Sequence, residues 1–405
     1  MGHIASSGIQ ENRQSRYGNS SQESECGMKR FGWILLLLAA AAPAWAATSV
    51  TVDQMKQKLI SLQQNMKGDV DVAAWLSQVE LSEQLTRNDR SALEQVAPGP
   101  LAGEQFDILE GHSAFLAPPA ASVPATPPPD ATAQKALLDK AVSFVAKTSA
   151  QNPHLTTSKV TTRFQDILKN SSTSVGLTVN APNPYTREWD ARDEQVESEK
   201  GIEKSSAARA KTKWGENGQI SDAEPPPSPS AILGEAAAAG KLSWLRWETI
   251  DGKPVAVLSF AVDKKKSHYL VSYCCFPNTD TQSGIAASGT FVPIPGEIQS
   301  ITTWKPFKKV VSYRGEFFIE PQTGALVRLN LYAELKPTDF VHQESRRIDY
   351  RPVVVAGKEY ELPVDSYILN EVVPGGDSNA TAYSARHSLF NVTYQNYKLA
   401  GEPQK

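Results

Sequence analysis

Two adjacent cysteines, Cys274 and Cys275, are the residues whose types and spacing most directly suggest chemistry. Joined to each other, they would close a strained ring that acts as a redox-labile switch. Left as thiols on a strand, they would point to opposite faces, one packed and one exposed. The surrounding pattern of residues 269–276 favours the strand, and Cys274 and Cys275 stand as a candidate redox pair.

Histidine is the usual partner of a reactive thiol. His268 begins the same segment, but at a rise of about 3.3 Å per residue it would lie about 20 Å from Cys274 along one strand. That distance is too long for a proton relay. An imidazole from a neighbouring strand, His342 or His387, remains an alternative partner, and we expect each histidine to be structural or exposed.

The remaining histidines and acids follow no catalytic spacing. There is no HExxH, CxxC pair, GxSxG, SxxK, P-loop or GxGxxG pattern, so the sequence predicts no catalytic site, no metal site and no cofactor. Paired carboxylates need no local motif, so a hydrolase with dispersed acids or histidines remains an alternative. We expect the acids near the predicted strands to face solvent or to pair with Arg346, Arg347 and Arg351; they are Asp339, Glu344, Asp349 and Glu371.

Aromatic residues supply a different kind of candidate site. Most of them are expected to pack in the core, but some could line a groove for a hydrophobic ligand or a peptide. The candidates for such a groove are Trp244, Trp247, Trp304 and Phe317.

Composition narrows the class of protein. The 405 residues hold 41 Lys plus Arg and 44 Asp plus Glu, a formal charge of −3, which argues against a nucleic-acid binder. Three cysteines cannot form a disulfide scaffold. A hydrophobic content of 40% is enough to bury a core.

The segment 28–46 has the three parts of a secretory signal peptide. Met28-Lys29-Arg30 is positively charged, residues 31–42 are apolar, and Ala44 and Ala46 are small residues at positions −3 and −1 of a cleavage site. The apolar stretch is shorter than the roughly 20 residues that span a bilayer. We therefore expect cleavage after Ala46 and a periplasmic or extracellular protein that is not integral to the membrane. Residues 1–27 form a polar leader, which makes Met28 the more natural start.

Four segments follow the signal. Apolar residues at three- and four-residue steps predict a helical region over 47–116. Six prolines in 117–130 predict an extended linker. The α+β domain at 131–405 begins with a helix at 133–150 and a strand at 156–164. We predict a mobile, charge-rich excursion at 169–228, where a lid is the less favoured alternative, and then a short helix at 231–241.

The last 160 residues or so predict an antiparallel meander. Residues 255–262, 269–276, 314–319 and 326–335 have strand patterns, and residues 326–335 alternate apolar and polar side chains with a period of two. Gly252, Gly324 and Gly357 lie at three predicted hairpin turns. The fold class is therefore α+β, with an N-terminal helical region and an open C-terminal antiparallel sheet, curled toward a half-barrel and packed on helices.

Several stretches of the chain resemble a group of uncharacterised exported proteins of acidobacteria. The likeness extends from about residue 50 to residue 398 and rests on turns and strands, so it implies no active site. The curled meander is also similar, by topology alone, to the fold of periplasmic lipoprotein carriers, which implies a greasy groove. The stretches that carry the first resemblance are Trp244–Glu248, Ser267–Tyr269, Tyr313–Arg328, Gly111–Pro119 and Thr161–Phe164.

These observations favour an exported, non-enzymatic binding protein. Its partner would be a lipid, a lipoprotein or a protein of the cell envelope, bound on the concave face of the sheet. The alternatives are the exported hydrolase and an interaction module of a cell-envelope complex, in which the helical region and the linker present the surface.

Overall fold

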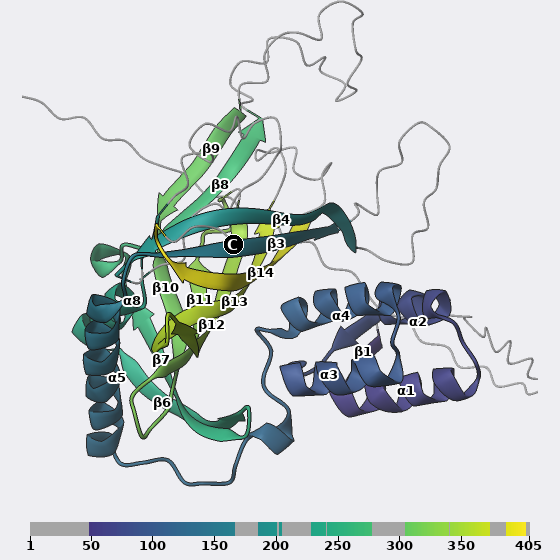
Figure 1. Ribbon diagram of the computed structural model, residues 1–405, viewed down its shortest axis with the longest axis horizontal. Coiled ribbons are helices and arrows are strands. Elements are labelled where there is room, and N and C mark those ends of the chain that lie inside the picture. Colours follow the sequence, from purple (N-terminus) through teal and green to yellow (C-terminus); the bar gives the residue numbers. More distant parts are fainter. Residues whose placement is uncertain are drawn as a thin grey trace, which may run out of the picture. The chain divides into compact units, whose positions relative to one another are not determined.

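The computed structural model describes residues 48–166, 185–200, 202–204, 228–239, 241–277, 304–339, 341–372 and 386–401 (Figure 1). The predicted signal peptide lies outside these residues. Among the helices that are described, none is both long and apolar enough to cross a membrane.

The helical region contains four helices and one short pair of strands. The prediction of helices is confirmed in four places but is wrong for residues 79–81, which form β2 and pair in parallel with β1. Met55, Leu59 and Phe106 are among the fully buried side chains of a core that belongs to this region. The elements are β1 (Thr48–Val50), α1 (Val52–Gln64), α2 (Asp69–Leu76), β2 (Val79–Leu81), α3 (Arg87–Val96) and α4 (Pro100–Ser113).

Helix α4 begins at a residue that has no side chain to cap it. Gly99 is the N-cap residue, and the carboxylate of Asp69, at the start of α2, accepts hydrogen bonds from the amides of Leu101 and Ala102 at 3.0 and 2.9 Å. A Cβ atom at Gly99 would lie 2.1 Å from that carboxylate. The cap is therefore supplied by another helix, which ties α2 to α4.

A ten-stranded antiparallel sheet forms the larger part of the fold. Its order is β5-β4-β3-β14-β13-β12-β11-β10-β7-β6, and its two end strands differ, so the sheet is open and the predicted fold class is confirmed. Strand β3 pairs with β14. The strands are β3 (Leu155–Asp166), β4 (Tyr185–Glu199), β5 (Ile202–Lys204), β6 (Leu242–Ile250), β7 (Lys253–Val262), β10 (Ser312–Ile319), β11 (Leu326–Glu334), β12 (Val341–Val355), β13 (Lys358–Val372) and β14 (Arg386–Leu399).

A separate hairpin of two strands completes the β-structure. It consists of β8 (Leu270–Pro277) and β9 (Trp304–Val310), which pair antiparallel. The short helix η2 (Lys264–Lys266) precedes β8. Figure 1 shows the two strands side by side, extending away from the ten-stranded sheet.

Two helices cover one face of the ten-stranded sheet, which we call the inner face. They are α5 (Ala131–Gln151) and α8 (Pro229–Ala239), and both were predicted. Leu138 and Val145 of α5 share a core with Phe317 and Leu329 of the sheet. This burial of apolar surface fixes the helices on the sheet.

The turn between β10 and β11 approaches the backbone of α5 closely. Gly324 has φ +85°, and a Cβ atom there would lie 2.8 Å from the main-chain oxygen of Lys140. The Lys140 Nζ donates hydrogen bonds to the main-chain oxygens of Pro321 and Gln322, at 3.0 and 3.1 Å. Gly252 and Gly357 also have positive φ, so the three predicted hairpin glycines are confirmed.

The predicted excursion at 169–228 is wrong for residues 185–199 and 202–204. The former are β4, which pairs along β3, and the latter are β5. Between Glu194 and Glu199 only Val196 is buried. A strand near the end of a sheet needs few apolar side chains, and a charge-rich sequence therefore concealed it.

The proline-rich linker contacts both parts that it joins. It contains the short helix η1 (Ala120–Ser122). The Gln84 amide donates to the Ala117 oxygen at 2.8 Å, and the Trp247 Nε1 donates to the Pro127 oxygen at 3.0 Å. The linker thus lies against the edge strand β6. It covers this edge without pairing with it as a strand, which limits the pairing of β6 with strands of other molecules.

The other face of the sheet, the outer face, packs against the helical region. Ile108 of α4 shares a small core with Phe164, Leu369 and Leu389. The Asn391 side chain donates to the Asp107 oxygen at 3.0 Å. The predicted period of two in β11 is confirmed for Leu329, Leu331 and Ala333, which share the core of the inner face, and is wrong for Val327. Both faces of the strand are covered.

Charged side chains are buried on the outer face. Arg328 Nε and Arg347 Nη2 contact the Asp349 carboxylate at 2.6 and 2.8 Å, and all three residues are more than 90% buried. This confirms an ion-paired role for Asp349.

Val327 packs with Val257 and Phe318 rather than with Leu329, because a β-bulge interrupts the pairing of β10 with β11.

Gly111 makes the close contact between α4 and the sheet possible. A Cβ atom there would lie 2.7 Å from both Cδ atoms of Leu389. We expect Gly111→Ala to lower the free energy of unfolding by about 1–3 kcal/mol, because the helix must move off the strand. Urea unfolding measures the change.

Gly103 is the matched control in the same helix. A Cβ atom there meets nothing within 4 Å. Gly103→Ala is expected to raise stability by about 0.5–1 kcal/mol through helix propensity. Equal effects of the two substitutions would contradict close packing at Gly111.

Candidate functional site

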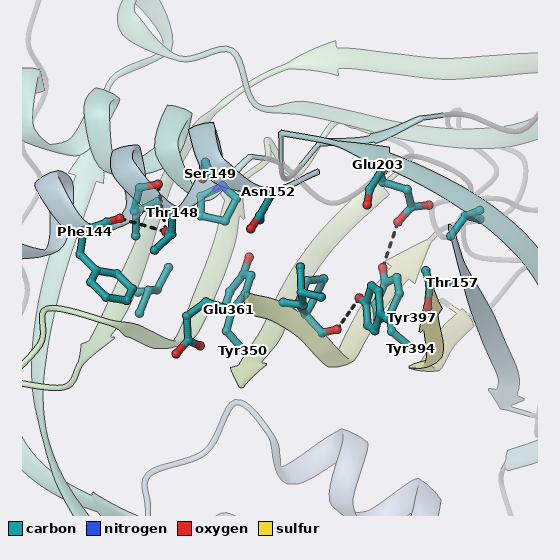
Figure 2. Close-up of a pocket in the computed structure, with 17 residues that line it drawn as sticks. Phe144, Thr148, Ser149, Asn152, Thr157, Glu203, Tyr350, Glu361, Tyr394 and Tyr397 are labelled. Atoms are coloured by element: carbon teal, nitrogen blue, oxygen red, sulfur yellow. Dashed lines mark hydrogen bonds between the residues drawn. The ribbon is translucent and has the colours of Figure 1, made fainter. Parts of the chain in front are cut away.

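A pocket lies between α5 and the inner face of the sheet (Figure 2). Its enclosed volume is about 60 Å³, and most of its lining surface is apolar. The lining residues come from α5, the start of α8 and the strands β3, β4, β5, β11, β12, β13 and β14. They are Phe144, Val145, Thr148, Ser149, Asn152, Thr157, Val196, Ser198, Glu203, Pro229, Leu326, Tyr350, Glu361, Leu362, Pro363, Tyr394 and Tyr397.

Helix α5 presents its lining residues at helical spacing. Phe144, Thr148 and Asn152 follow each other at four-residue steps and so lie on one face of the helix. The Thr148 hydroxyl donates to the Phe144 main-chain oxygen at 2.9 Å, which satisfies it locally. Helix α5 thus lines one side of the pocket with both apolar and polar side chains.

One end of the pocket is formed by a buried ion pair. Lys159 Nζ contacts the Glu203 carboxylate at 3.0 Å, and the Tyr394 hydroxyl donates to the same carboxylate at 3.2 Å. Figure 2 shows Glu203 and Tyr394 joined in this way. Burial, together with the Glu203 charge, raises the pKa of Tyr394 well above its usual value, so its hydroxyl stays protonated. The pair holds β5 over the inner face.

Two further side chains place polar atoms beside the apolar lining. The Tyr397 hydroxyl donates to the Pro363 main-chain oxygen at 2.7 Å. Glu361 is half-buried, and burial, followed by the charges of Glu359 and Glu320, raises its pKa to about 7. Small changes of pH near neutrality therefore shift the Glu361 carboxyl group between its neutral and its charged form.

Glu361 is expected to make stability fall as the pH rises. The folded protein holds the carboxyl proton more tightly than the unfolded chain, so stability is lost from about pH 4.5 up to about pH 7. Glu361→Gln should flatten this part of the profile and raise stability above about pH 7. Urea unfolding at several pH values measures it.

The exposed Glu334 provides the control for this titration. Glu334→Gln should leave the slope of the profile unchanged. An unaltered slope in Glu361→Gln would mean that Glu361 is not the titrating group.

Three of the four aromatic residues predicted to line a groove lie outside this pocket. Phe317 is fully buried and stacks on Phe260 at 4.1 Å between ring centroids. Trp244 packs against the same core and lies edge-to-face with Trp247. The side chain of Trp304 is outside the described residues. Neither Trp244, Trp247 nor Phe317 lines the pocket.

Cys274 and Cys275 lie on β8, as the strand interpretation predicts. The pairing of β8 with β9 is irregular between Tyr273 and Phe276, so the two cysteines occupy a bulge. Their side chains are outside the described residues, and the candidate redox pair stays a prediction.

Three of the described histidines lie beside separate acids, and the third of them, His387, is 3.9 Å from Glu371 through its Nε2 atom. His268 Nδ1 contacts Glu235 at 2.7 Å, and His154 Nε2 contacts Glu197 at 3.0 Å. Within the described part of the chain, no group of three histidine, cysteine or acidic residues is arranged to hold a metal ion. The predicted acids Asp339 and Glu344 contact Lys309 and the Tyr269 hydroxyl.

Sequence reasoning missed the tyrosines of the pocket. Tyr350, Tyr394 and Tyr397 come from two strands that are far apart in the chain, and no local motif joins them. The four-residue spacing of Phe144, Thr148 and Asn152 is the one local signal for this pocket in the sequence.

No protein-family model matches the chain, and a comparison with curated protein sequences gives no match. Two solved structures are similar to it. A DUF1329 family protein from Desulfovibrio piger has a TM-score of 0.28 at 10% identity, over 67% of this chain and 94% of that one. The Pseudomonas aeruginosa MucA/MucB complex has a TM-score of 0.21 at 8% identity, over 64% and 94%. These likenesses are too weak to bear on function.

The pocket is chemically suited to binding. Its described lining residues include two carboxylates but neither histidine nor cysteine. The Glu203 carboxylate is already engaged by Lys159 and Tyr394. Apolar walls with a few fixed polar groups instead suit an apolar ligand with one polar feature.

Proposed function

We propose that this protein is an exported binding protein that holds the hydrocarbon chain of a lipid or lipoprotein between α5 and the inner face of the sheet. The apolar pocket under α5 is the observation that supports this proposal most directly. The export part rests on the signal-like segment 28–46.

The shape of the pocket supports a narrow, flexible ligand. Phe144, Val145, Leu326 and Leu362 supply apolar contact area. An enclosed volume of about 60 Å³ has room for a short length of hydrocarbon and excludes a bulky ring system. Only part of a longer chain would be held under α5, and the rest would extend beyond the pocket.

Filling the pocket tests the proposal. Ser149 lines the pocket and Ser143 is exposed on the same helix. A fluorescent long-chain fatty acid is titrated into the wild-type protein, Ser149→Phe and Ser143→Phe. We expect saturable binding that Ser149→Phe weakens at least about tenfold and Ser143→Phe leaves unchanged, since a phenyl ring would occupy the space of the ligand.

Native mass spectrometry of protein purified from the cell envelope provides the second measurement. Bound lipid that is lost in Ser149→Phe would agree with the proposal. Absence of both bound lipid and fatty-acid binding in the folded wild-type protein would overturn it.

A further inference from the structure

The β8–β9 hairpin and the short helix η2 before it carry an unusual excess of positive charge. Residues 263–277 and 304–310 contain six lysines and one aspartate, a net charge of +5, whereas the whole chain has −3. We propose that this surface docks on an anionic lipid membrane. We call it the hairpin surface: Lys264, Lys265, Lys266, Leu270, Lys308 and Val310.

Three of these lysines have no acidic partner in the part of the chain that the structure describes. Lys309, next to the hairpin surface, pairs with Asp339, and the Lys266 Nζ donates to the Ala238 main-chain oxygen. No acid within the described residues forms an ion pair with Lys264, Lys265 or Lys308, and η2 and Lys308 are exposed. Asp263, the acid beside η2, pairs with Lys241. The positive charge therefore faces solvent.

Two exposed apolar side chains lie in the same hairpin as Lys308. Leu270 and Val310 are opposite each other in the hairpin and are 39% and 38% exposed. Val271, the next residue, is fully buried in the core of the inner face, so the other side of the strand is anchored. An anchored hairpin with lysines and two apolar side chains on its free side has the composition of an interfacial membrane contact.

The choice of lysine favours a lipid surface over a defined protein partner. The hairpin surface contains no arginine, and lysine is a compact charge that needs no fixed geometry at its partner. Lipid phosphates form such a diffuse partner, and each lysine near an anionic bilayer contributes to binding. Neither the pocket under α5 nor the pocket between α1 and α4 includes a residue of the hairpin surface.

Vesicle binding tests the proposal on the chain from Ala47 onward. This part contains every described element, forms one compact unit and lacks the apolar segment 31–46, which would bind vesicles by itself. Sedimentation is compared with phosphatidylcholine vesicles and with vesicles that also contain phosphatidylglycerol. We expect binding to the anionic vesicles alone, and a decrease as salt is added.

Charge reversal locates the contact. Lys264→Glu/Lys265→Glu/Lys308→Glu should lower the partition coefficient at least about 100-fold. The control Lys58→Glu/Lys147→Glu/Lys358→Glu changes the net charge equally at exposed sites on α1, α5 and β13 and should bind nearly as wild type. Leu270→Ser/Val310→Ser should weaken binding several-fold and keep its salt dependence.

Two results would overturn the proposal. One is equal binding to neutral and anionic vesicles, or none, which would leave an acidic protein as the partner of this surface. The other is an equal loss in the hairpin variant and in its control, which would mean that net charge rather than this surface decides binding.

Discussion

Replacement of Asp349 by alanine is expected to lower the free energy of unfolding by about 3–5 kcal/mol. The Asp349 carboxylate lies between Arg328 Nε at 2.6 Å and Arg347 Nη2 at 2.8 Å, on the face of the sheet covered by the helical region. Without it, two buried guanidinium groups face each other. Arg328 would keep only distant contacts with Glu248 and Gln84, at 3.9 and 3.5 Å.

The same carboxylate makes stability depend on acid pH. Burial alone would raise the pKa of Asp349, but the charges of Arg328 and Arg347 outweigh it and hold the pKa well below its usual range. The stabilisation is therefore complete above the pKa of the unfolded chain and is lost as the pH falls through the lower folded value. Urea unfolding between neutral and strongly acid pH should show this loss in the wild type and not in Asp349→Ala.

Asp139→Ala is the matched control. Asp139 also pairs with a cation, Lys135, at 2.5 Å, but both side chains are more than half exposed on α5. An exposed pair contributes about 0–1 kcal/mol. If the two substitutions destabilised the protein equally, burial of the arginines beneath the helical region would be disproved.

Gly324→Ala is expected to have the second large effect, about 2–5 kcal/mol of lost stability. Positive φ costs a residue with a Cβ atom about 1–2 kcal/mol, and overpacking adds about 1–3 kcal/mol. Both apply, because Gly324 has φ +85° and its Cβ would approach the backbone of Lys140. The tip of a side chain can adopt another rotamer, but the backbone of a helix cannot, so α5 has to shift as a whole.

Gly252→Ala separates the two causes. Gly252 has φ +76°, and a Cβ atom there meets nothing within 4 Å. It should therefore show the conformational cost alone. Because α5 also lines the pocket, Gly324→Ala should in addition change fatty-acid binding by the folded protein. Equal destabilisation by the two substitutions would show that α5 and the turn are not in close contact.

Local signals in the sequence predicted most of the elements. The alternation of residues 326–335 identified a strand, and Gly252, Gly324 and Gly357 identified turns, because period and backbone conformation are local properties. They did not reveal that Arg328 and Asn330 are buried on the face opposite to Leu329. Burial of the second face depends on a helical region more than 200 residues earlier in the chain.

The pocket could not be predicted in the same way. Tyr350 and Tyr394 line one cavity because β12, β13 and β14 are neighbours, and this order is a property of the whole sheet. The groove residues were predicted from their aromatic type. This criterion selected Phe317, which is part of the core, and Trp244, which packs against it. A polar sequence likewise hid β4, since strand position rather than composition decides how apolar a strand must be.

The pairing of β3 with β14 has a consequence for how the chain folds. Residues 155–166 find their partner only at residues 386–399, so the middle of the sheet cannot close until more than 200 intervening residues have been produced. Contacts of such long sequence separation slow folding. Helices α1–α4 have mainly local contacts and can form early. A chain that completes its sheet last stays unfolded for longer, and such a delay would suit the export proposed for this protein.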